Sequence, residues 1–364
     1  MGLVEDRRAL HQIPELVRDL PETRAYLERA LSGLGCRVFS PEGSSVCALF
    51  DFGRPDALAF RADMDALPIL EATGLPFASR HKGKMHACGH DGHMAVLLGL
   101  ARDLAGRSQL PHNVLLVFQP AEETGGGAKD ICRSGVFARQ SVRAIFGLHL
   151  WPDLPAGTVA SRAGPMMTRS SEVTVEVTGR SAHVARAEEG LDALAACAAW
   201  YQGAAALERS LPQDTPRLLK FGRMEAGTVR NAVAGSARLE GTLRTFQDEL
   251  HGRLQAQLQD LSGHVERETG CQVAVRFSEG YPALINPPAL LEQVQKLYPV
   301  APLARPALIT EDFSWYQQAL PGLFFFLGCG PAPALHAADF DFDEGALSVG
   351  LDLFRAIAEG MPCN

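Results

Sequence analysis

Short apolar segments that alternate with helical segments constrain the fold of this chain more than any other feature. Residues 5–35 are predicted to be helical with breaks at Pro14 and Pro21, and a strongly apolar helix is predicted from Gly92 to Leu104. Strands that alternate with helices form α/β layers, often around a parallel sheet. We therefore expect an α/β domain on a mostly parallel sheet, with strands at 46–50, 57–61, 113–118, 144–149 and 323–327.

The middle of the chain has a different pattern. Residues 172–178 alternate between valine and polar side chains, which is typical of a half-buried strand. Further strands and helices follow in the order β-α-β-β-α-β, which predicts a ferredoxin-like α+β domain. They are expected at 191–207, 218–221, 237–243, 250–269 and 273–277. We place this inserted domain at 166–277, between two segments, 1–165 and 278–364, that form the larger domain.

Composition and charge exclude several classes of partner. The chain of 364 residues is 46% apolar, carries a formal net charge of −8 and has a pI near 5.8. The length favours two domains, and the apolar content is sufficient for a full core. Because there is no basic stripe, we expect no nucleic-acid partner and no anionic membrane surface. An anionic small molecule remains compatible, since the field within a cleft can oppose the net charge.

The sequence predicts a cytoplasmic protein. The first residues, MGLVED, are acidic and lack the apolar core of a secretory signal, and Asp6 stands where a myristoylation motif needs Ser or Thr. The most apolar run, 320–327, is too short to span a membrane. Eight cysteines without a pairwise spacing pattern indicate reduced thiols.

A dense cluster of metal-binding side chains precedes the predicted helix at 92–104. Residues 86–93 have the sequence HACGHDGH. Thiolate and imidazole both suit divalent ions such as zinc, manganese or cobalt. Cys88 and His90 are two residues apart, so in an extended segment both side chains would point to one side. One histidine at this place could be a surface residue or a cap, but the cluster favours a metal site.

Two adjacent carboxylates follow the predicted strand at 113–118. Glu122 and Glu123 begin a glycine-rich loop. Neighbouring side chains diverge, so one carboxylate can bind a metal while the other acts as a general base. A solvated acidic turn is the alternative. The position beyond the carboxyl end of a strand favours a site, because ligands collect there in open α/β sheets.

Single polar residues at other predicted strand ends and in one loop are further candidates for the site. His149 ends the strand at 144–149, and His336 lies in a loop rich in proline and alanine. Each could equally be a structural histidine. Asp63 and Asp65 follow the strand at 57–61, and Asp65 could hydrogen-bond the second nitrogen of a metal-bound histidine. A turn-initiating aspartate before Pro68 is the alternative.

Together these motifs resemble one family. The runs DMDALP at 63–68, HACGHDGH at 86–93, QPAEE at 119–123 and FGLH at 146–149 are similar to the amidohydrolase branch of the dinuclear, zinc exopeptidase-like metallopeptidases. That branch includes hippurate hydrolases, N-acyl-amino-acid amidohydrolases, auxin-conjugate hydrolases and N-acetyldiaminopimelate deacetylases. The resemblance covers nearly the whole chain. Carboxypeptidase G and succinyl-diaminopimelate desuccinylase are more distant. They carry histidine where this chain has Asp63, so their ligand pattern cannot be transferred to this chain.

The resemblance implies a role for each matching residue. It implies that Glu122 is the general acid/base, and that two divalent ions, zinc or manganese with cobalt or nickel as alternatives, are bound in the catalytic domain. The implied ligands are Cys88, His90, Glu123, His149 and His336. The run TEDF at 310–313 also matches a family motif, with a structural or supporting role.

The inserted domain resembles the family's lid, through which the subunits form a homodimer. His183 matches a histidine that reaches the active site, often from the partner subunit, and Asn231 and Arg244 match residues that hold the substrate carboxylate. A guanidinium and an amide suit a carboxylate chemically. Many relatives have a Pro-His pair shortly after the lid histidine, whereas Arg186 and Glu188 follow it here. This departure bears on substrate choice.

The expected reaction is hydrolysis of an N-acyl amino acid to a carboxylic acid and a free amino acid, with His183 stabilising the oxyanion. A biosynthetic deacetylase of the N-acetyldiaminopimelate type, or a dipeptidase, would use the same site and stays open. A non-catalytic protein with a structural metal is the remaining alternative. A closed structural site has no use for a spare carboxylate such as Glu122, so the sequence favours an enzyme.

Overall fold

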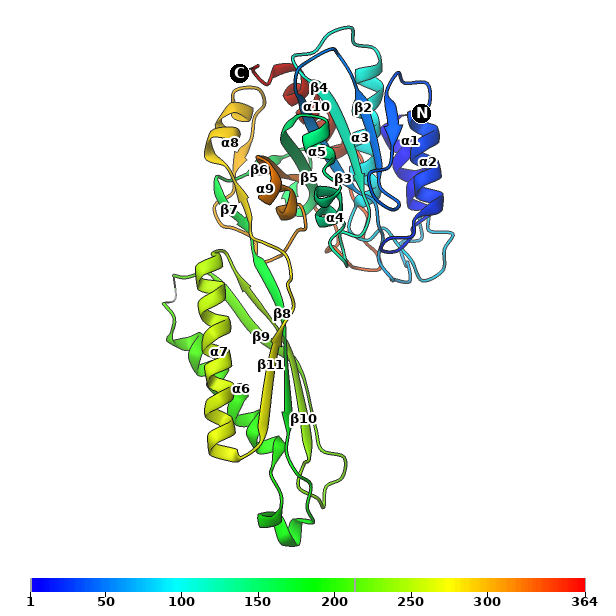
Figure 1. The fold of residues 1–364 in the computed structure, drawn as a ribbon. Helices are drawn as coiled ribbons and strands as arrows, with labels where there is room; N and C mark the ends of the chain where they lie inside the picture. The colour runs from blue at the N-terminus through cyan, green and yellow to red at the C-terminus, as the bar shows by residue number, and fades with distance from the viewer. Residues whose placement is uncertain (1, 213, 364) are drawn as a thin grey trace. The chain divides into compact units, whose positions relative to one another are not determined.

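The computed structural model describes residues 2–212 and 214–363, and it divides the chain into two compact units (Figure 1). The first comprises Met1–Met166, Ile285–Pro306 and Glu311–Asn364, and the second comprises Met167–Leu284 and Ala307–Thr310. The inserted domain was predicted to end at 277. The second unit instead continues to Leu284 and includes four later residues, 307–310, which the prediction placed in the larger domain.

Strands and helices alternate along much of the first unit, and they have the order βαββαβ in the second. In chain order they are α1 (Leu3–His11), α2 (Pro21–Leu31), β1 (Arg37–Phe39), β2 (Val46–Phe50), β3 (Ala57–Asp63), α3 (His90–Ala105), β4 (Asn113–Gln119), α4 (Gly127–Arg133), α5 (Val136–Arg139), β5 (Val142–Pro155), β6 (Val159–Ser161), β7 (Gly164–Met167), β8 (Arg169–Thr178), η1 (Val184–Glu189), α6 (Ala193–Ser210), β9 (Arg217–Ala226), β10 (Ser236–Thr245), α7 (Asp248–Thr269), β11 (Gln272–Phe277), β12 (Leu284–Asn286), α8 (Pro288–Gln295), β13 (Ala301–Pro302), α9 (Ser314–Ala319), β14 (Gly322–Gly330) and α10 (Ala346–Gly360).

The first unit is built on an eight-stranded sheet in the order β1-β2-β4-β3-β5-β14-β6-β13. Its central strands β4, β3, β5 and β14 run parallel, whereas β1, β2 and β6 join it by antiparallel pairing. Strands β2, β3 and β14 are buried along their whole length, which explains their continuous apolar sequences. The predicted α/β fold on a mostly parallel sheet is confirmed.

Helices cover both faces of this sheet, as Figure 1 shows. On one face α3 packs against α1 and α10, and Phe60 of β3 contacts Phe354 of α10. On the other face α4, α5 and α9 pack together, and Phe137 of α5 contacts Tyr316 of α9. Since successive side chains of a strand point to opposite faces, Arg61 of β3 lies on the face that α9 covers. This placement becomes important for the site.

The second unit is a four-stranded antiparallel sheet in the order β11-β8-β10-β9, packed against α6 and α7. This order is that of a ferredoxin-like α+β fold, as predicted. Val173, Val175 and Val177 of β8 are buried beneath the helices together with Trp200 of α6. The alternation that predicted β8 therefore separates a core face from a polar face. No helix among residues 2–212 and 214–363 has the length and apolar character needed to cross a bilayer.

Candidate metal centre

The parallel strands of the first unit carry the predicted metal ligands to one edge of the sheet. In the register of the sheet Asp63 at the end of β3 pairs with Gln119 at the end of β4. Among the groups of side chains at this edge whose ligand atoms lie within 4.8 Å of one another, three contain the predicted ligands and neither Asp63 nor Asp312. These groups are Cys88 with His90 and His149, Cys88 with Glu123 and His336, and His90 with Glu122 and Glu123. All five predicted ligands thus meet, and Cys88 belongs to two of the groups.

The backbone around Cys88 and His90 differs from the prediction. An extended segment was expected, but Gly89 has a left-handed backbone (φ 84°, ψ 13°) and His90 is the first residue of α3. Both side chains reach the site through this turn rather than through strand alternation. A glycine is required here, because left-handed φ disfavours other residues and a Cβ would lie 2.9 Å from Leu150 Cδ1.

Two histidines are held with Nε2 free to bind a metal. His90 Nδ1 lies 2.7 Å from the backbone oxygen of Asp65, and His149 Nδ1 lies 2.7 Å from that of Leu150. A carbonyl oxygen only accepts, so Nδ1 must carry the proton in each ring and Nε2 presents a lone pair. Burial also lowers the pKa of His90, and it lowers the pKa of His149 to about 3, which keeps both rings neutral.

His149 was predicted to end its strand, but β5 continues to Pro155. The reason is that β5 pairs with β14 far beyond its pairing with β3, which stops at Arg61 and Gly147. His149 therefore lies two residues beyond the last β3–β5 pair, level with Asp63 at the end of β3, with Nε2 3.3 Å from Cys88 Sγ.

His336 approaches the other ligands from the C-terminal part of the first unit. Its backbone N–H donates to the oxygen of Ala87, next to Cys88, at 2.8 Å. Its Nε2 lies 3.4 Å from Glu123 Oε1, and this carboxylate raises the pKa of His336. His336 has a left-handed backbone (φ 67°), and half of its side chain is exposed. It closes the cluster on its solvent side.

The unsatisfied atoms at the centre of the cluster fit divalent cations. His90 Nε2 and Glu123 Oε1 are buried, lie 3.9 Å apart and make no hydrogen bond. A divalent cation bound to both atoms would satisfy these two lone pairs. Burial and the nearby Glu123 raise the pKa of the Cys88 thiol, yet a coordinating thiol is deprotonated by its metal. Thiolate, imidazole and carboxylate together suit borderline-soft ions.

Glu122 and Glu123 are held by Asp65. The N–H of Glu122 donates to Asp65 Oδ1 at 3.0 Å, and that of Glu123 donates to Oδ2 at 3.2 Å. The carboxylate of Asp65 was expected to orient a histidine, but its backbone oxygen does so, since the carboxylate lies 3.8 Å from His90 Nδ1. Its two oxygens instead fix the pair of glutamates. Burial, followed by Glu311, raises the pKa of Glu122.

A buried ionic network beneath the site was not predicted. Arg61 donates to Asp63, Glu311 and Asp312 at 2.7–3.0 Å and is fully buried. Asp63 in turn accepts from His93 Nδ1 at 2.7 Å. The other ring nitrogen of His93, Nε2, accepts from the N–H of Leu150. His93 therefore supports the site and has no lone pair left for a metal. One signal was visible in the sequence, because a charged residue interrupts the apolar strand ALAFRAD.

The three predicted residues of the inserted domain do not meet within one chain. His183 and Asn231 are neighbours, since the N–H of Val184 donates to the backbone oxygen of Asn231 at 3.2 Å. Both lie beyond the end of β10 that begins with Ser236, whereas Arg244 is eight residues further along that strand. At about 3.3 Å per residue the two ends are about 25 Å apart. One chain cannot offer Asn231 and Arg244 to the same carboxylate.

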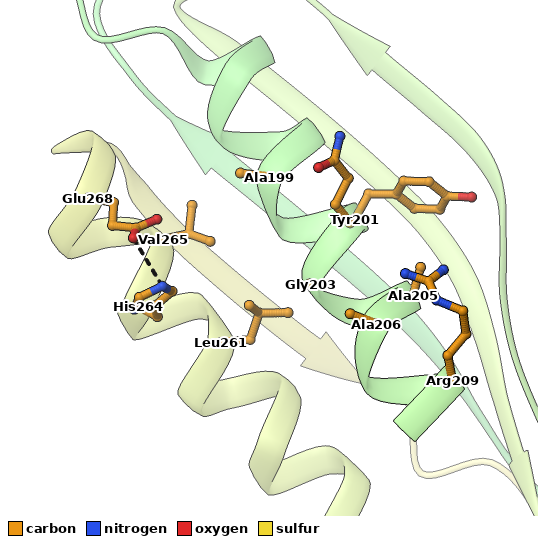
Figure 2. Close-up of a pocket in the computed structure, with 11 residues that line it drawn as sticks. Ala199, Tyr201, Gly203, Ala205, Ala206, Arg209, Leu261, His264, Val265 and Glu268 are labelled. Carbon is orange, nitrogen blue, oxygen red and sulfur yellow. Dashed lines mark ion pairs between the residues drawn. The ribbon is translucent and has the colours of Figure 1, made fainter. Parts of the chain in front are cut away.

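A groove of about 650 Å³ lies between α6 and α7 in the second unit (Figure 2). Small residues such as Ala199, Gly203 and Ala206 line it, and His264 forms an ion pair with Glu268 at 3.1 Å. None of the described residues that line it belongs to a metal-binding group. The cluster around Cys88 is the centre that can carry metal chemistry.

Comparison with known proteins decides the family. The sequence model of "Peptidase family M20/M25/M40" matches residues 59–360, which include all five clustered ligands. The chain belongs to this family. It is accordingly a metal-dependent hydrolase, and the predicted resemblance and the predicted enzyme class are confirmed.

Two named relatives match this chain along nearly its whole length. The N-acetyldiaminopimelate deacetylase of Lacticaseibacillus paracasei is 38% identical, over 96% of this chain and 95% of its own. That of Limosilactobacillus fermentum is 35% identical, over 96% and 94%. These relatives support amide hydrolysis as the reaction class.

Solved structures of other proteins agree with the fold. A dinuclear metal binding peptidase of the M20 family from Bacillus subtilis superposes with a TM-score of 0.85 at 32% identity, covering 98% of this chain and 96% of the other. The aminobenzoyl-glutamate utilization protein from Klebsiella pneumoniae has a TM-score of 0.71 at 24% identity, covering 99% and 96%. The second of these shows the shared fold alone.

Proposed function

We propose that this M20/M25/M40 member hydrolyses the amide bond of N-acyl amino acids and releases a carboxylic acid and a free amino acid. The observation that carries the proposal is the pair Glu122 and Glu123 on one loop, with Glu123 among the ligands and Glu122 buried beside them. A binding or structural site would need only the ligand carboxylate, that of Glu123.

The ligand set supports two divalent ions per chain, with zinc or manganese preferred and cobalt or nickel as alternatives. Cys88 would hold an ion together with His90 and His149 in one group, and together with Glu123 and His336 in another. Such a pair of ions lowers the pKa of water and polarises a carbonyl oxygen.

In the proposed reaction Glu122 moves the proton. Its carboxylate takes the proton of the attacking water and returns it to the nitrogen of the leaving amino acid. Asp65 keeps Glu122 in place through the N–H of that residue. Surroundings that raise the pKa of Glu122 also make its carboxylate a stronger base toward water.

Arg244 is proposed to bind the carboxylate of the substrate. Its Nη1 donates to the backbone oxygen of Leu308 at 2.6 Å, while its Nε is buried without a hydrogen bond. Burial lowers the pKa of Arg244, and no acidic neighbour among the described residues offsets this effect. A substrate carboxylate would provide both the missing acceptor and the missing charge.

His183 and Asn231 are proposed to come from the partner subunit of a homodimer, because one chain keeps them about 25 Å from Arg244. His183 Nδ1 accepts from the N–H of Ala185 at 3.1 Å, so the neutral ring carries its proton on Nε2, where it can be donated to an oxyanion. Strand β9 lies at an edge of its sheet and exposes Met224, which supports pairing between subunits.

A deacetylase acting on N-acetyldiaminopimelate is the most specific candidate within this class, because the relatives at 35–38% identity carry that name. A dipeptidase would use the same centre. The cytoplasm is the proposed compartment, and the eight free cysteines agree with reducing conditions.

The test is a turnover assay on metal-loaded enzyme with N-acetyldiaminopimelate, N-acetyl, N-benzoyl and longer N-acyl amino acids, dipeptides, and matched N-acyl amino acid amides. We expect hydrolysis of free acids and a loss of about 100-fold or more for the amides. Arg244→Ala should remove this discrimination, whereas Arg238→Ala on the same strand should not. Equal rates for acids and amides would contradict the proposed role of the carboxylate.

A further inference from the structure

The loop that carries Glu122 and Glu123 is closed at both ends by one side chain. This loop joins the last residue of β4, Gln119, to the start of α4 at Gly127. Asp312 accepts from Gln119 Nε2 at 2.8 Å and 2.7 Å, one contact to each oxygen, and from the N–H of Ala128 at 3.0 Å. The two residues that flank the loop are thus bound to the same carboxylate.

Both carboxylate oxygens of Asp312 already accept hydrogen bonds. Arg61 Nη2 donates to its Oδ1 at 2.9 Å, so its two oxygens accept from a guanidinium, an amide and a backbone N–H. Asp312, Gln119 and Ala128 are all fully buried. In such surroundings each hydrogen bond is strong and its loss is costly, which suits a group that holds a fixed geometry.

The loop itself contains backbone positions with unusual conformational freedom. It contains three successive glycines, of which Gly125 and Gly126 have positive φ. Its ends approach closely, because a Cβ on Gly127 would lie 1.8 Å from the backbone oxygen of Pro120. Asp65 holds the middle of the loop through two backbone N–H groups. Gln119 pairs with Asp63 in the sheet, and the N–H of Gly127 donates to the oxygen of Ala121 at 3.0 Å, so Asp312 adds a side-chain link between the ends to these backbone contacts.

We propose that Asp312 is a positioning residue, which closes the loop at 120–127 and thereby fixes Glu122 and Glu123 relative to Cys88 and His90. The effect of Asp312 on turnover rests on the proposed function, in which Glu122 is the general base. A displacement of about 1 Å at a reacting group can cost about 100-fold in rate. Asp312 does not touch the substrate, so substrate binding should be unaffected.

The test compares Asp312→Asn with Asp6→Asn. Asp6 is another fully buried aspartate of the first unit, but it accepts from Tyr26 and pairs with Arg102, far along the chain from the loop. In Asp312→Asn we expect kcat per metal-loaded site to fall about 100-fold with KM unchanged. The visible spectrum of the cobalt-loaded protein should change, and cobalt affinity should fall about 10–100-fold. Asp6→Asn should lower stability only.

Gly127→Ala provides an independent route to the same result, because it opens the loop sterically and leaves every carboxylate in place. It should reproduce the loss of kcat and the changed cobalt spectrum. If Asp312→Asn does not fold, this variant decides the question.

A wild-type cobalt spectrum and kcat in folded Asp312→Asn or Gly127→Ala would overturn the proposal, and so would equal changes in Asp6→Asn. If the wild-type enzyme hydrolyses no N-acyl amino acid, the proposed function fails. The cobalt spectra and affinities of the variants still test the positioning role, since they do not depend on turnover.

Discussion

The neutral histidines of the metal centre depend on single hydrogen bonds to backbone oxygens. His90 donates to Asp65 and His149 donates to Leu150, so each Nε2 is available and neither ring has to lose a proton to bind a metal. Cys88 differs, because burial raises the pKa of its thiol and only a bound cation makes the thiolate favourable. The thiol therefore links metal binding to proton release.

This difference leads to a prediction for Cys88→Ser. A serine hydroxyl stays protonated, so cobalt affinity should fall by more than about 100-fold, beyond the loss typical of an outer partner. The thiolate-to-cobalt charge-transfer absorption should also disappear. Cys47→Ser, at another buried cysteine of the same unit, should keep both properties. An unchanged charge-transfer band in Cys88→Ser would show that the thiolate is not a ligand.

Residue types and spacing indicated part of this site, and only the folded chain supplies the rest. Cys88, His90 and the pair Glu122 and Glu123 could be predicted, because several chemically suitable side chains lie close in sequence. His336 could not be derived from its own segment. Neither could the roles of Asp312 and Asp65, since their partners are brought near by the sheet and not by sequence proximity.

At the scale of elements, α1 is fastened to the first unit by a buried arginine. Arg7 pairs with Asp91 of α3 at 3.0 Å and with Glu344 before α10 at 3.1 Å, and its guanidinium stacks between the rings of Phe77 and Phe342. Its side chain is 1% exposed. The cation therefore compensates the buried carboxylate of Asp91, which also lies 2.7 Å from His11 Nδ1.

Arg7→Leu should lower the free energy of unfolding of the first unit by about 3–5 kcal/mol, because it removes the permanent cation beside the buried Asp91 and leaves that carboxylate with His11 as its partner. Arg8→Leu is a matched control, since Arg8 also pairs with Glu344 but is half exposed, and it should lower the stability much less. Urea unfolding followed by circular dichroism measures both. Similar losses in the two variants would contradict the importance assigned to burial.

A buried histidine gives the second unit a dependence on pH. His251 of α7 lies 2.9 Å from Ser171 Oγ and 3.1 Å from Thr245 Oγ1, and burial lowers its pKa to about 4. An unfolded histidine has a pKa of about 6.5. The unfolded chain therefore binds more protons between these values, so the stability from neutral His251 is present above pH 6.5 and is lost as pH falls toward 4.

Hydrogen exchange of α7 and β10 peptides should accordingly accelerate between pH 6.5 and pH 4.5, after correction for the intrinsic pH dependence of exchange. His251→Gln should reduce this acceleration, while His264→Gln, at an exposed position of the same helix, should leave it unchanged. An identical pH response in all three proteins would exclude His251 as the cause.

The prediction of elements was most accurate where strands and helices are buried. Val46–Phe50 was placed at its observed bounds, and the helix predicted at 250–269 begins only two residues earlier. Strand β9 was predicted to end at Phe221 but extends to Ala226, because its last residues are exposed at a sheet edge and show no alternation. Helix α10 was not predicted, although its apolar residues have helical spacing.

At the scale of the whole molecule, the proposed active site is shared between subunits. Arg244 and the metal ligands would come from one chain, and His183 and Asn231 from its partner. A mixed dimer of His183→Ala and Glu122→Gln chains then contains one site with both residues intact. After random exchange of subunits, about a quarter of wild-type activity should return, since half of the dimers are mixed and each has one complete site.

Each variant mixed with itself provides the control and should stay inactive. Native mass spectrometry confirms that mixed dimers have formed. No recovery in a sample that contains them would place His183 and Glu122 of one site in the same chain, and a monomeric wild-type protein would contradict the dimer itself.

The fold of the first unit matters for function because its parallel strands gather residues from four distant segments at one sheet edge. The metal ligands alone would make this edge a binding site, and the buried carboxylate of Glu122 makes it a candidate catalyst. The most direct measurement is therefore the metal content and turnover of Glu122→Gln in a single preparation. We predict two bound divalent ions per chain, as in the wild type, with kcat lower by about 10²–10⁴-fold. Turnover equal to that of the wild type, at the same metal content, would contradict the central claim.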